Sequence, residues 1–314
     1  MLLTRRPSAA IWLAVAALLG AGGGLVACKG ADTASAPGAF VEPGLRSLSY
    51  PTRLAVAADG TVFVSDAANK AVFGYQGDRK TFELGGLERP LGVAVRGSTL
   101  FVGDAGRGTV EAYDLERRAF AFALGKGAGE FATPNAIALA PDGDEVLVVD
   151  SGRGEVRVFD FDGAPLRTIG RPGTGADEFQ FPVALAVDAT RVVVADQGNL
   201  RVQVFDRDGR WRSSIGQPFA GVLEDVSALK GHFSRPQGVA ISDDRILVLD
   251  SAQAFVQVFD GQGAFVGFGG PALSGDRHLP LLLDLIVTPD RRLLLTEPGA
   301  RRYVSVALDL RPMP

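Results

Sequence analysis

A proline followed by an alternating apolar stretch, and then by an acidic residue about fifteen positions later, recurs six times in this chain. Successive prolines are separated by 39, 44, 48, 54 and 44 residues, which is the length of a four-stranded propeller blade. Five of the acidic residues are aspartates. The prolines are Pro51, Pro90, Pro134, Pro182, Pro236 and Pro280, and the acidic residues are Asp66, Asp104, Asp150, Asp196, Asp250 and Glu297.

The fourth repeat shows how each unit divides into strands. Residues 183–187 (VALAV) and 191–195 (RVVVA) predict two strands, and residues 200–206 (LRVQVFD) predict a third. Residues 210–216 (RWRSSIG) predict a more polar outer strand. The chain has 40 glycines, and the repeats show no helical period, so the sequence predicts an all-β fold.

The fourth repeat also carries a family resemblance. Residues 181–188 (FPVALAVD) and 194–206 (VADQGNLRVQVFD) resemble the NHL repeat, which reads P-x-G-V-A-V-D and then V-A-D-x-x-N-H-R-I-Q-V-F-D. Leu200 stands where that family prefers histidine, and the first and sixth repeats depart furthest from the pattern. The resemblance covers residues 38–310 and implies a six-bladed β-propeller with four-stranded blades. It implies no single activity, because one fold hosts many functions.

A propeller ring must close, because an open ring leaves the edge of a sheet unpaired. The sixth repeat offers three strand-like segments before the chain ends in a short tail, residues 311–314. Residues 38–41 (GAFV) are identical to residues 263–266, which belong to an outer strand. We therefore expect the N-terminal segment to complete the last blade. The alternative is that residues 38–48 are only a linker.

The first 27 residues read as a bacterial lipoprotein signal peptide. Arg5 and Arg6 precede the apolar stretch 9–19, and Leu-Val-Ala-Cys at 25–28 has the form of a lipobox. Cys28, the one cysteine of the chain, is therefore the expected lipid-attachment site. A transmembrane anchor and a catalytic cysteine are the alternatives.

The segment that follows predicts how the domain is attached. Residues 28–37 are small, polar and unpatterned, which is typical of a flexible tether. Lys29, rather than an aspartate, after the cysteine resembles lipoproteins that are sorted to the outer membrane of Gram-negative bacteria. The expected organisation is a signal peptide (1–27), a lipid-anchored tether (28–37), a propeller (38–310) and a tail (311–314), located in the cell envelope.

Charge and composition exclude several classes of function. The formal net charge of −4 argues against nucleic-acid binding, which needs a concentrated basic surface. We expect no cofactor or metal, since His232 and His278 alone make an incomplete zinc site. The glycine runs 125–129 and 173–175 lead into no helix and offer no phosphate site. The repeated aspartates predict turn caps rather than catalytic acids.

The first strands of the repeats are expected to line a central channel. The position two residues after the proline is small in the second to fifth repeats. When the repeats are aligned on their turn residues, the first has Arg53 at this position and the sixth has Asp284. Opposite charges in neighbouring blades predict an ion pair across the seam where the ring closes. The residues just before these positions should rim the channel mouth, and they include no ring of carboxylates: Thr52, Leu91, Asn135, Val183, Gln237 and Leu283.

Function is predicted from the loops. The turns between second and third strands share one face, here called the top face, with the connections between blades. The expected binding residues there and at the mouth are Arg53, Asn69, Arg107, Asn135, Arg153, Asn199, Gln237, Asp284 and Arg301, beside the long connection 217–235. We expect a protein or an envelope glycan as partner. The alternatives are a lyase or hydrolase acting at the channel mouth and a structural spacer.

Overall fold

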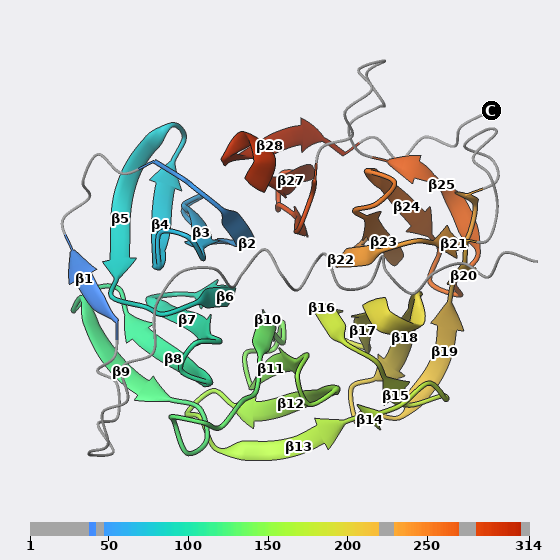
Figure 1. Cartoon of the computed structure of the whole chain (residues 1–314), viewed down its shortest axis with the longest axis horizontal. Coiled ribbons are helices and arrows are strands. Elements are labelled where there is room, and N and C mark those ends of the chain that lie inside the picture. Colours follow the sequence, from blue (N-terminus) through green and yellow to red (C-terminus); the bar gives the residue numbers. More distant parts are fainter. Residues whose placement is uncertain (1–37, 42–46, 220–228, 270–280, 309–314) are drawn as a thin grey trace, which may run out of the picture. The chain divides into compact units, whose positions relative to one another are not determined.

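A computed structural model describes residues 38–41, 47–219, 229–269 and 281–308. These residues form six antiparallel blades around a centre, so the predicted six-bladed β-propeller is confirmed (Figure 1). The signal peptide, Cys28, the tether, the tail, His278 and residues 220–228 of the long connection lie outside the described residues. In the described part of the chain, no helix is long and apolar enough to span a membrane.

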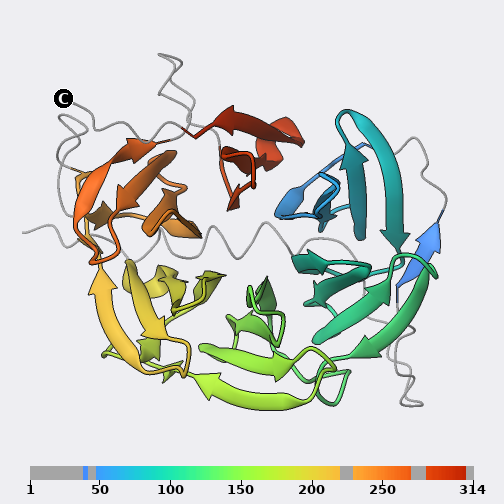
Figure 2. The same ribbon diagram turned by 180° about the vertical axis from the view of Figure 1, so that it is seen from behind.

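Blades two to five each contain four strands in sequence order, with the first strand innermost (Figures 1 and 2). Blade two consists of β6 (Pro90–Arg96), β7 (Thr99–Asp104), β8 (Thr109–Asp114) and β9 (Ala119–Ala123). Blade three consists of β10 (Pro134–Leu139), β11 (Glu145–Asp150), β12 (Glu155–Asp160) and β13 (Pro165–Ile169). Blade four consists of β16 (Pro182–Val187), β17 (Arg191–Asp196), β18 (Arg201–Asp206) and β19 (Trp211–Ile215). Blade five consists of β22 (Pro236–Ser242), β23 (Arg245–Asp250), β24 (Phe255–Phe259) and β25 (Phe265–Gly269).

The first and last blades differ from this pattern. Blade one has five strands, which are β2 (Pro51–Val56), β3 (Val62–Asp66), β4 (Ala71–Gln76), β5 (Arg79–Gly85) and, outside β5, β1 (Ala39–Val41). Blade six has three in the described residues, β26 (Leu285–Val287), β27 (Arg292–Glu297) and β28 (Arg302–Ala307). Two 3-10 turns, η3 (Gln197–Asn199) and η5 (Pro298–Ala300), precede the third strands of blades four and six.

The N-terminal strand therefore does not complete the last blade, and that prediction is wrong. Strand β1 pairs antiparallel with β5 of blade one and lies on its outer side (Figure 1). The Phe40 ring explains the preference, because it packs edge-on against Phe82 at 5.4 Å and against Tyr113 of blade two at 6.0 Å between ring centroids. The Gly38 N–H also donates to the Tyr113 hydroxyl over 2.8 Å. Aromatic packing between blades one and two thus holds this segment.

The core lies between the blades, with one apolar cluster at each of the six seams. Strand β17 shows why the second strands are continuously apolar. Val192 and Val194 pack towards blade three, whereas Val193 and Ala195 pack towards blade five, and all four are fully buried. A strand covered on both faces has no solvent-facing side, so the usual apolar–polar alternation disappears.

Short parallel ladders organise two of the connections between blades. Strand β14 (Arg171–Pro172) pairs with β15 (Glu178–Phe179), and β20 (Gln217–Pro218) pairs with β21 (His232–Phe233). The glutamine of the repeat motif holds these connections in place. In blade four Gln203 donates to the Glu178 carbonyl over 2.7 Å, and in blade five Gln257 donates to the His232 carbonyl over 2.7 Å. The glutamine of the repeat motif therefore has a structural role in these two blades.

Candidate functional site

Arg53 enters the channel from an irregularity in the first strand. The pairing of β2 with β3 shifts register between Pro51 and Leu54, so Thr52 and Arg53 have no cross-strand partner in β3. The freed Arg53 N–H donates to the buried Ser65 hydroxyl over 3.0 Å. This bulge directs a long basic side chain into the channel, where only 3% of the residue is exposed.

The Arg53 guanidinium meets four other blades. Its Nη1 forms an ion pair with Asp284 Oδ1 of blade six over 2.9 Å, which confirms the predicted bridge across the seam. The same nitrogen donates to the Leu283 carbonyl over 3.0 Å and to the Gln237 carbonyl of blade five over 3.4 Å. The other two nitrogens of the guanidinium complete the set. Nη2 donates to Asn135 Oδ1 over 3.1 Å and to the Val183 carbonyl, and Nε donates to the Asn135 carbonyl over 3.3 Å.

One residue thus connects blade one with blades three, four, five and six. Asp284 completes the arrangement, because its second carboxylate oxygen accepts the Leu54 N–H over 2.8 Å. All three nitrogens of the guanidinium (Nε, Nη1 and Nη2) donate to acceptors in the first strands. The mouth of the channel is therefore closed by a cation whose donors already have partners.

Two of the predicted rim residues, Asn135 and Gln237, share this network through their side chains. The Asn135 side chain accepts from Arg53, and Gln237 accepts a hydrogen bond from Gln197 at the turn of blade four. Gln237 is 8% exposed, whereas Asn135 is partly exposed. The structure brings Arg53, Asn135, Gln237 and Asp284 together as one cluster around the guanidinium.

The repeated aspartates are turn caps, as predicted. Asp250 accepts N–H donors from Ser234 and Arg235, before the first strand of its blade, and from Ala252 and Gln253 in the turn. Asp66, Asp104 and Asp150 accept N–H donors on both sides in the same way. Asp196 accepts the Gln180 N–H before its first strand and, from the turn, the side chains of Asn199 and Arg201. All four are fully buried. Burial raises the pKa of Asp196 and Asp250 despite the hydrogen bonds that they accept. Glu297, in the sixth repeat, pairs instead with Arg302 over 2.8 Å.

Three of the predicted top-face residues hold connections between blades, and Asn69 holds the segment that precedes β2. The Asn69 amide donates to the Ser47 carbonyl over 2.8 Å, and the Asn199 amide donates to the Gly173 carbonyl over 2.9 Å. Arg107 and Arg153 donate to carbonyls of the connections that precede their own blades. Arg301 is exposed at the end of η5 in a left-handed conformation. Their part in binding a partner stays a prediction.

Two exposed aromatic residues of the top face escaped the sequence reasoning. Tyr50 and Phe181 directly precede the prolines that begin the first strands of blades one and four, and they are 38% and 51% exposed. Phe181 has a φ of 52°, a left-handed conformation that is costly for a residue with a side chain. Arg89, Thr133 and Arg235 occupy the same position in blades two, three and five. The equivalence of these positions in the repeat was the signal that could have identified them.

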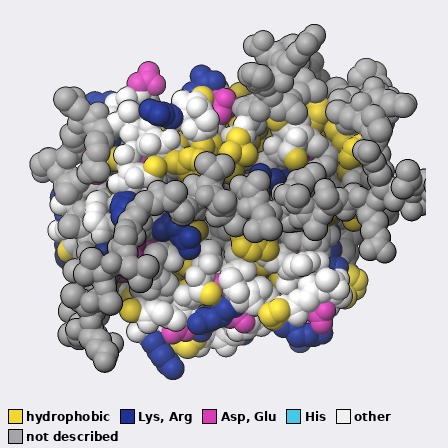
Figure 3. All heavy atoms as spheres, viewed as in Figure 1, with side chains coloured by type: hydrophobic (Ala, Val, Ile, Leu, Met, Phe, Trp, Pro, Cys, Tyr) yellow, Lys and Arg dark blue, Asp and Glu magenta, His cyan; other side chains and the backbone are white. Residues whose placement is uncertain are grey.

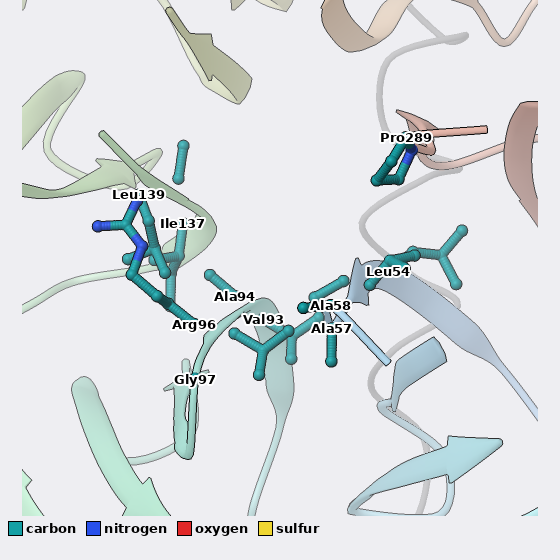
Figure 4. A pocket seen from close by; sticks show the side chains of 14 residues that line it. Leu54, Ala57, Ala58, Val93, Ala94, Arg96, Gly97, Ile137, Leu139 and Pro289 are labelled. Carbon is teal, nitrogen blue, oxygen red and sulfur yellow. The ribbon is translucent and has the colours of Figure 1, made fainter. Parts of the chain in front are cut away.

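A cavity lies further along the channel from Arg53. It has a volume of about 460 Å³ and is lined by the later residues of β2, β6 and β10 together with Pro289. Apart from that of Arg96, the side chains that line it are apolar, with Leu54, Val93 and Ile137 among them (Figure 4). Arg96 turns its guanidinium to Leu139 and donates to the Ala140 carbonyl of blade three. The cavity can therefore hold apolar groups but presents no acid or base to them.

Charge on the surface is mixed. Basic and acidic side chains are interspersed over the described residues of the face seen in Figure 3. Within residues 38–41, 47–219, 229–269 and 281–308, no three His, Cys, Asp or Glu side chains come together as metal ligands would. His232 lies at the base of the long connection, where its Nδ1 is 3.1 Å from the Lys230 carbonyl.

Buried Leu229 packs with Phe219, Phe255 and Phe268, so the described ends of the long connection dock onto blade five. The spacing of Phe219, Val222, Leu223, Val226 and Leu229 predicts a short helix, but residues 220–228 lie outside the described part.

The six antiparallel sheets arranged around a centre define a six-bladed β-propeller. No family model matches the sequence, and no curated protein matches it. Among solved structures, the chain resembles a gluconolactonase from Xanthomonas campestris, with a TM-score of 0.62 and 18% identity over 87% of this chain and 95% of that one. Virginiamycin B lyase from Staphylococcus aureus gives 0.62 and 12% over 85% and 87%. A chain of the nidogen–laminin complex gives 0.57 and 16% over 71% and 81%. At these sequence identities, 12–18%, the similarity to the solved structures shows that the fold is shared.

Proposed function

We propose that this chain is a lipid-anchored binding module of the bacterial cell envelope. In this proposal Cys28 carries the lipid, residues 28–37 form the tether, and the rim of the top face binds a partner protein. The anchor rests on the lipobox at residues 25–28 and on the lysine that follows. The six repeats would be divergent members of the NHL family, on the motif that the fourth repeat carries.

The observation that carries the binding role is the exposure of aromatic residues around a closed mouth. Tyr50 and Phe181 stand exposed immediately before the first strands, and Arg89 and Arg235 take the equivalent places in two other blades. Aromatic residues and arginine are enriched at protein interfaces and at their energetic centres. Arg53 blocks the channel behind this rim, so a partner would bind across the face.

The structural neighbours offer both a binding and an enzymatic precedent. The nidogen–laminin complex contains a propeller in a protein assembly, whereas the lyase and the gluconolactonase are enzymes. An enzyme with its site at the mouth needs a group free to act on substrate. Here Arg53 is engaged with Asp284 and with the carbonyls of Leu283 and Val183. This engagement favours the binding role.

The test compares two exposed apolar residues that lie on different surfaces. Phe181→Ala removes a side chain from the rim, and Leu166→Ala removes an equally exposed one (50%) from the outer strand β13. Affinity purification from detergent-solubilised membranes after cross-linking should recover a protein with wild type and with Leu166→Ala, and about tenfold less with Phe181→Ala.

Equal recovery with both variants would contradict a rim interface. If envelope glycan were recovered instead of protein, the proposed partner would be a glycan and not a protein.

A further inference from the structure

The cavity in the channel opens on the face opposite the top face. The first strand of each blade runs away from the connections of the top face and ends at the turn into the second strand. Three lining residues, Ala58, Gly97 and Pro289, lie in these turns of blades one, two and six, and all three are exposed. The volume of about 460 Å³ falls within the range of small-molecule sites, about 300–1,000 Å³. A ligand of that size can therefore enter from this side.

The other end of the cavity is closed by the Arg53–Asp284 pair. Leu54, the residue after Arg53, lines the cavity, and its N–H donates to Asp284 over 2.8 Å. The two charges of the pair are engaged with each other at 2.9 Å. The cavity is therefore a dead end, and its closed end offers a ligand no free charge.

The side chains that line the cavity are uncharged, with one exception that already has partners. Arg96 donates to the Ala140 carbonyl, and its guanidinium carbon lies 5.9 Å from the centroid of the Phe161 ring. Among the described residues that line the cavity, Arg96 alone carries a charge. An ionised group that entered would lose its hydration and gain no counter-charge. The lining therefore favours an uncharged occupant.

Backbone groups of the first strands also face the cavity. These strands form the inner edges of their sheets, and within the described ranges no strand pairs with those edges. The N–H groups of Ala57 and Ala140 donate towards the second strand, so the preceding residues, Val56 and Leu139, direct theirs into the channel. Val95 has the equivalent place in blade two. A ligand can therefore form a few hydrogen bonds with the walls although the side chains are apolar.

We infer that this cavity binds an uncharged small molecule with a mostly apolar surface and one or two hydrogen-bonding groups. The apolar part lies against Leu54, Val93 and Ile137, which have the same place in the register of blades one to three. The polar groups meet the inner edges of the first strands. Burial of apolar surface supplies the affinity, because the lining side chains give water few hydrogen-bond partners. The site is separate from the rim of the top face and does not depend on the lipid anchor.

The test uses two fluorescent probes that differ in charge. N-phenylnaphthylamine is uncharged, and anilinonaphthalene sulfonate has the same rings with an added sulfonate. Full-length protein is kept in solution by an amphipathic polymer, which leaves no free detergent to occupy the cavity. The uncharged probe should bind saturably at one site per chain, and the sulfonate at least about tenfold more weakly. Hydrogen exchange at the amides of Val56, Val95 and Leu139 should slow when the uncharged probe is bound.

A pair of exposed alanines provides the matched variants. Ala58→Phe places a ring at the open end of the cavity and should weaken binding of the uncharged probe about tenfold. Ala189 is also exposed and lies in the corresponding turn of blade four, but it does not line the cavity. Ala189→Phe should therefore bind the probe as wild type does. Both variants should keep the wild-type Tm, because neither position is buried.

Three results would overturn the inference: no saturable binding of the uncharged probe, binding of the sulfonate as tight as that of the uncharged probe, or equal effects of the two alanine substitutions. Slowed exchange that is confined to residues outside the first strands would overturn it as well. If Ala58→Phe fails to fold, hydrogen exchange of the wild type decides. These results leave the rim interface untouched, because that interface is tested by recovery of a partner.

Discussion

The Arg53–Asp284 pair allows the sharpest test of the channel architecture. The two side chains are 4% and 10% exposed and 2.9 Å apart, and the guanidinium also serves carbonyls of four blades. Removing either partner leaves a buried charge without its counterion, which costs about 3–5 kcal/mol. We expect Arg53→Ala to lower the free energy of unfolding by about 3 kcal/mol, the lower end, because water entering the channel will satisfy some carbonyls.

The double variant separates charge pairing from packing. Arg53→Ala with Asp284→Ala removes both charges, and the small residues Ala136 and Ala184 at the same position in blades three and four show that the site accepts them. We expect a coupling energy of about 1–3 kcal/mol from a double-mutant cycle in guanidinium chloride at neutral pH. The control pair Arg210–Asp208 has the same 2.9 Å separation but is 73% and 72% exposed. Its coupling should stay below about 1 kcal/mol.

A coupling energy near zero for Arg53 and Asp284, or one equal to that of the exposed control, would refute this reasoning. It would mean that the two side chains do not meet in solution and that the alignment of blades one and six is wrong. A large change in the denaturant slope of a single variant would instead indicate loss of two-state unfolding, and the cycle would then be measured by hydrogen exchange.

Two further predictions concern acid stability and the anchor. Hydrogen bonds from Arg167 and Arg207 lower the pKa of Glu145 below its ordinary value of 4.5, so its stabilising effect is present above that value and lost as pH falls through the lowered pKa. The difference in unfolding free energy between wild type and Glu145→Gln should therefore shrink on acidification below about pH 4.5 in denaturant titrations, and a constant difference would contradict it. Cys28→Ala should remove the protein from the membrane fraction and the lipid from its mass spectrum; an unchanged membrane level, with no lipid on the wild type, would contradict the anchor.

Much of the fold could be predicted because the repeat encodes each blade locally. In blades two to five the first strand begins at the predicted proline and the second strand ends at the predicted aspartate. The caps follow from chemistry within one repeat, since Asp150 reaches Ala132 and Thr133 before its own first strand. The ion pair of Arg53 with Asp284 could also be predicted, because the repeat aligns both residues with positions that line the channel.

The exposed rim could not be predicted in the same way. Phe181 begins an apolar stretch of the repeat motif, yet it has a left-handed backbone and its side chain is exposed. Conversely, Asn69 and Asn199 read as exposed binding residues, but their amides hold the segments that precede the first strands of blades one and four. Polarity in sequence does not distinguish a side chain that meets solvent from one that satisfies a nearby backbone carbonyl.

The number of blades follows from the number of repeats in the sequence, and the strand order and caps of blades two to five follow from residues within each repeat. How the ring ends was decided only by the tertiary structure. Residues 38–41 are identical to 263–266, and sequence alone could assign them to the open edge of the last blade. The packing of Phe40 against Phe82 and Tyr113 placed them on blade one. Competition between two sheet edges is settled by the side chains that each edge presents, and those side chains come together only when the ring forms.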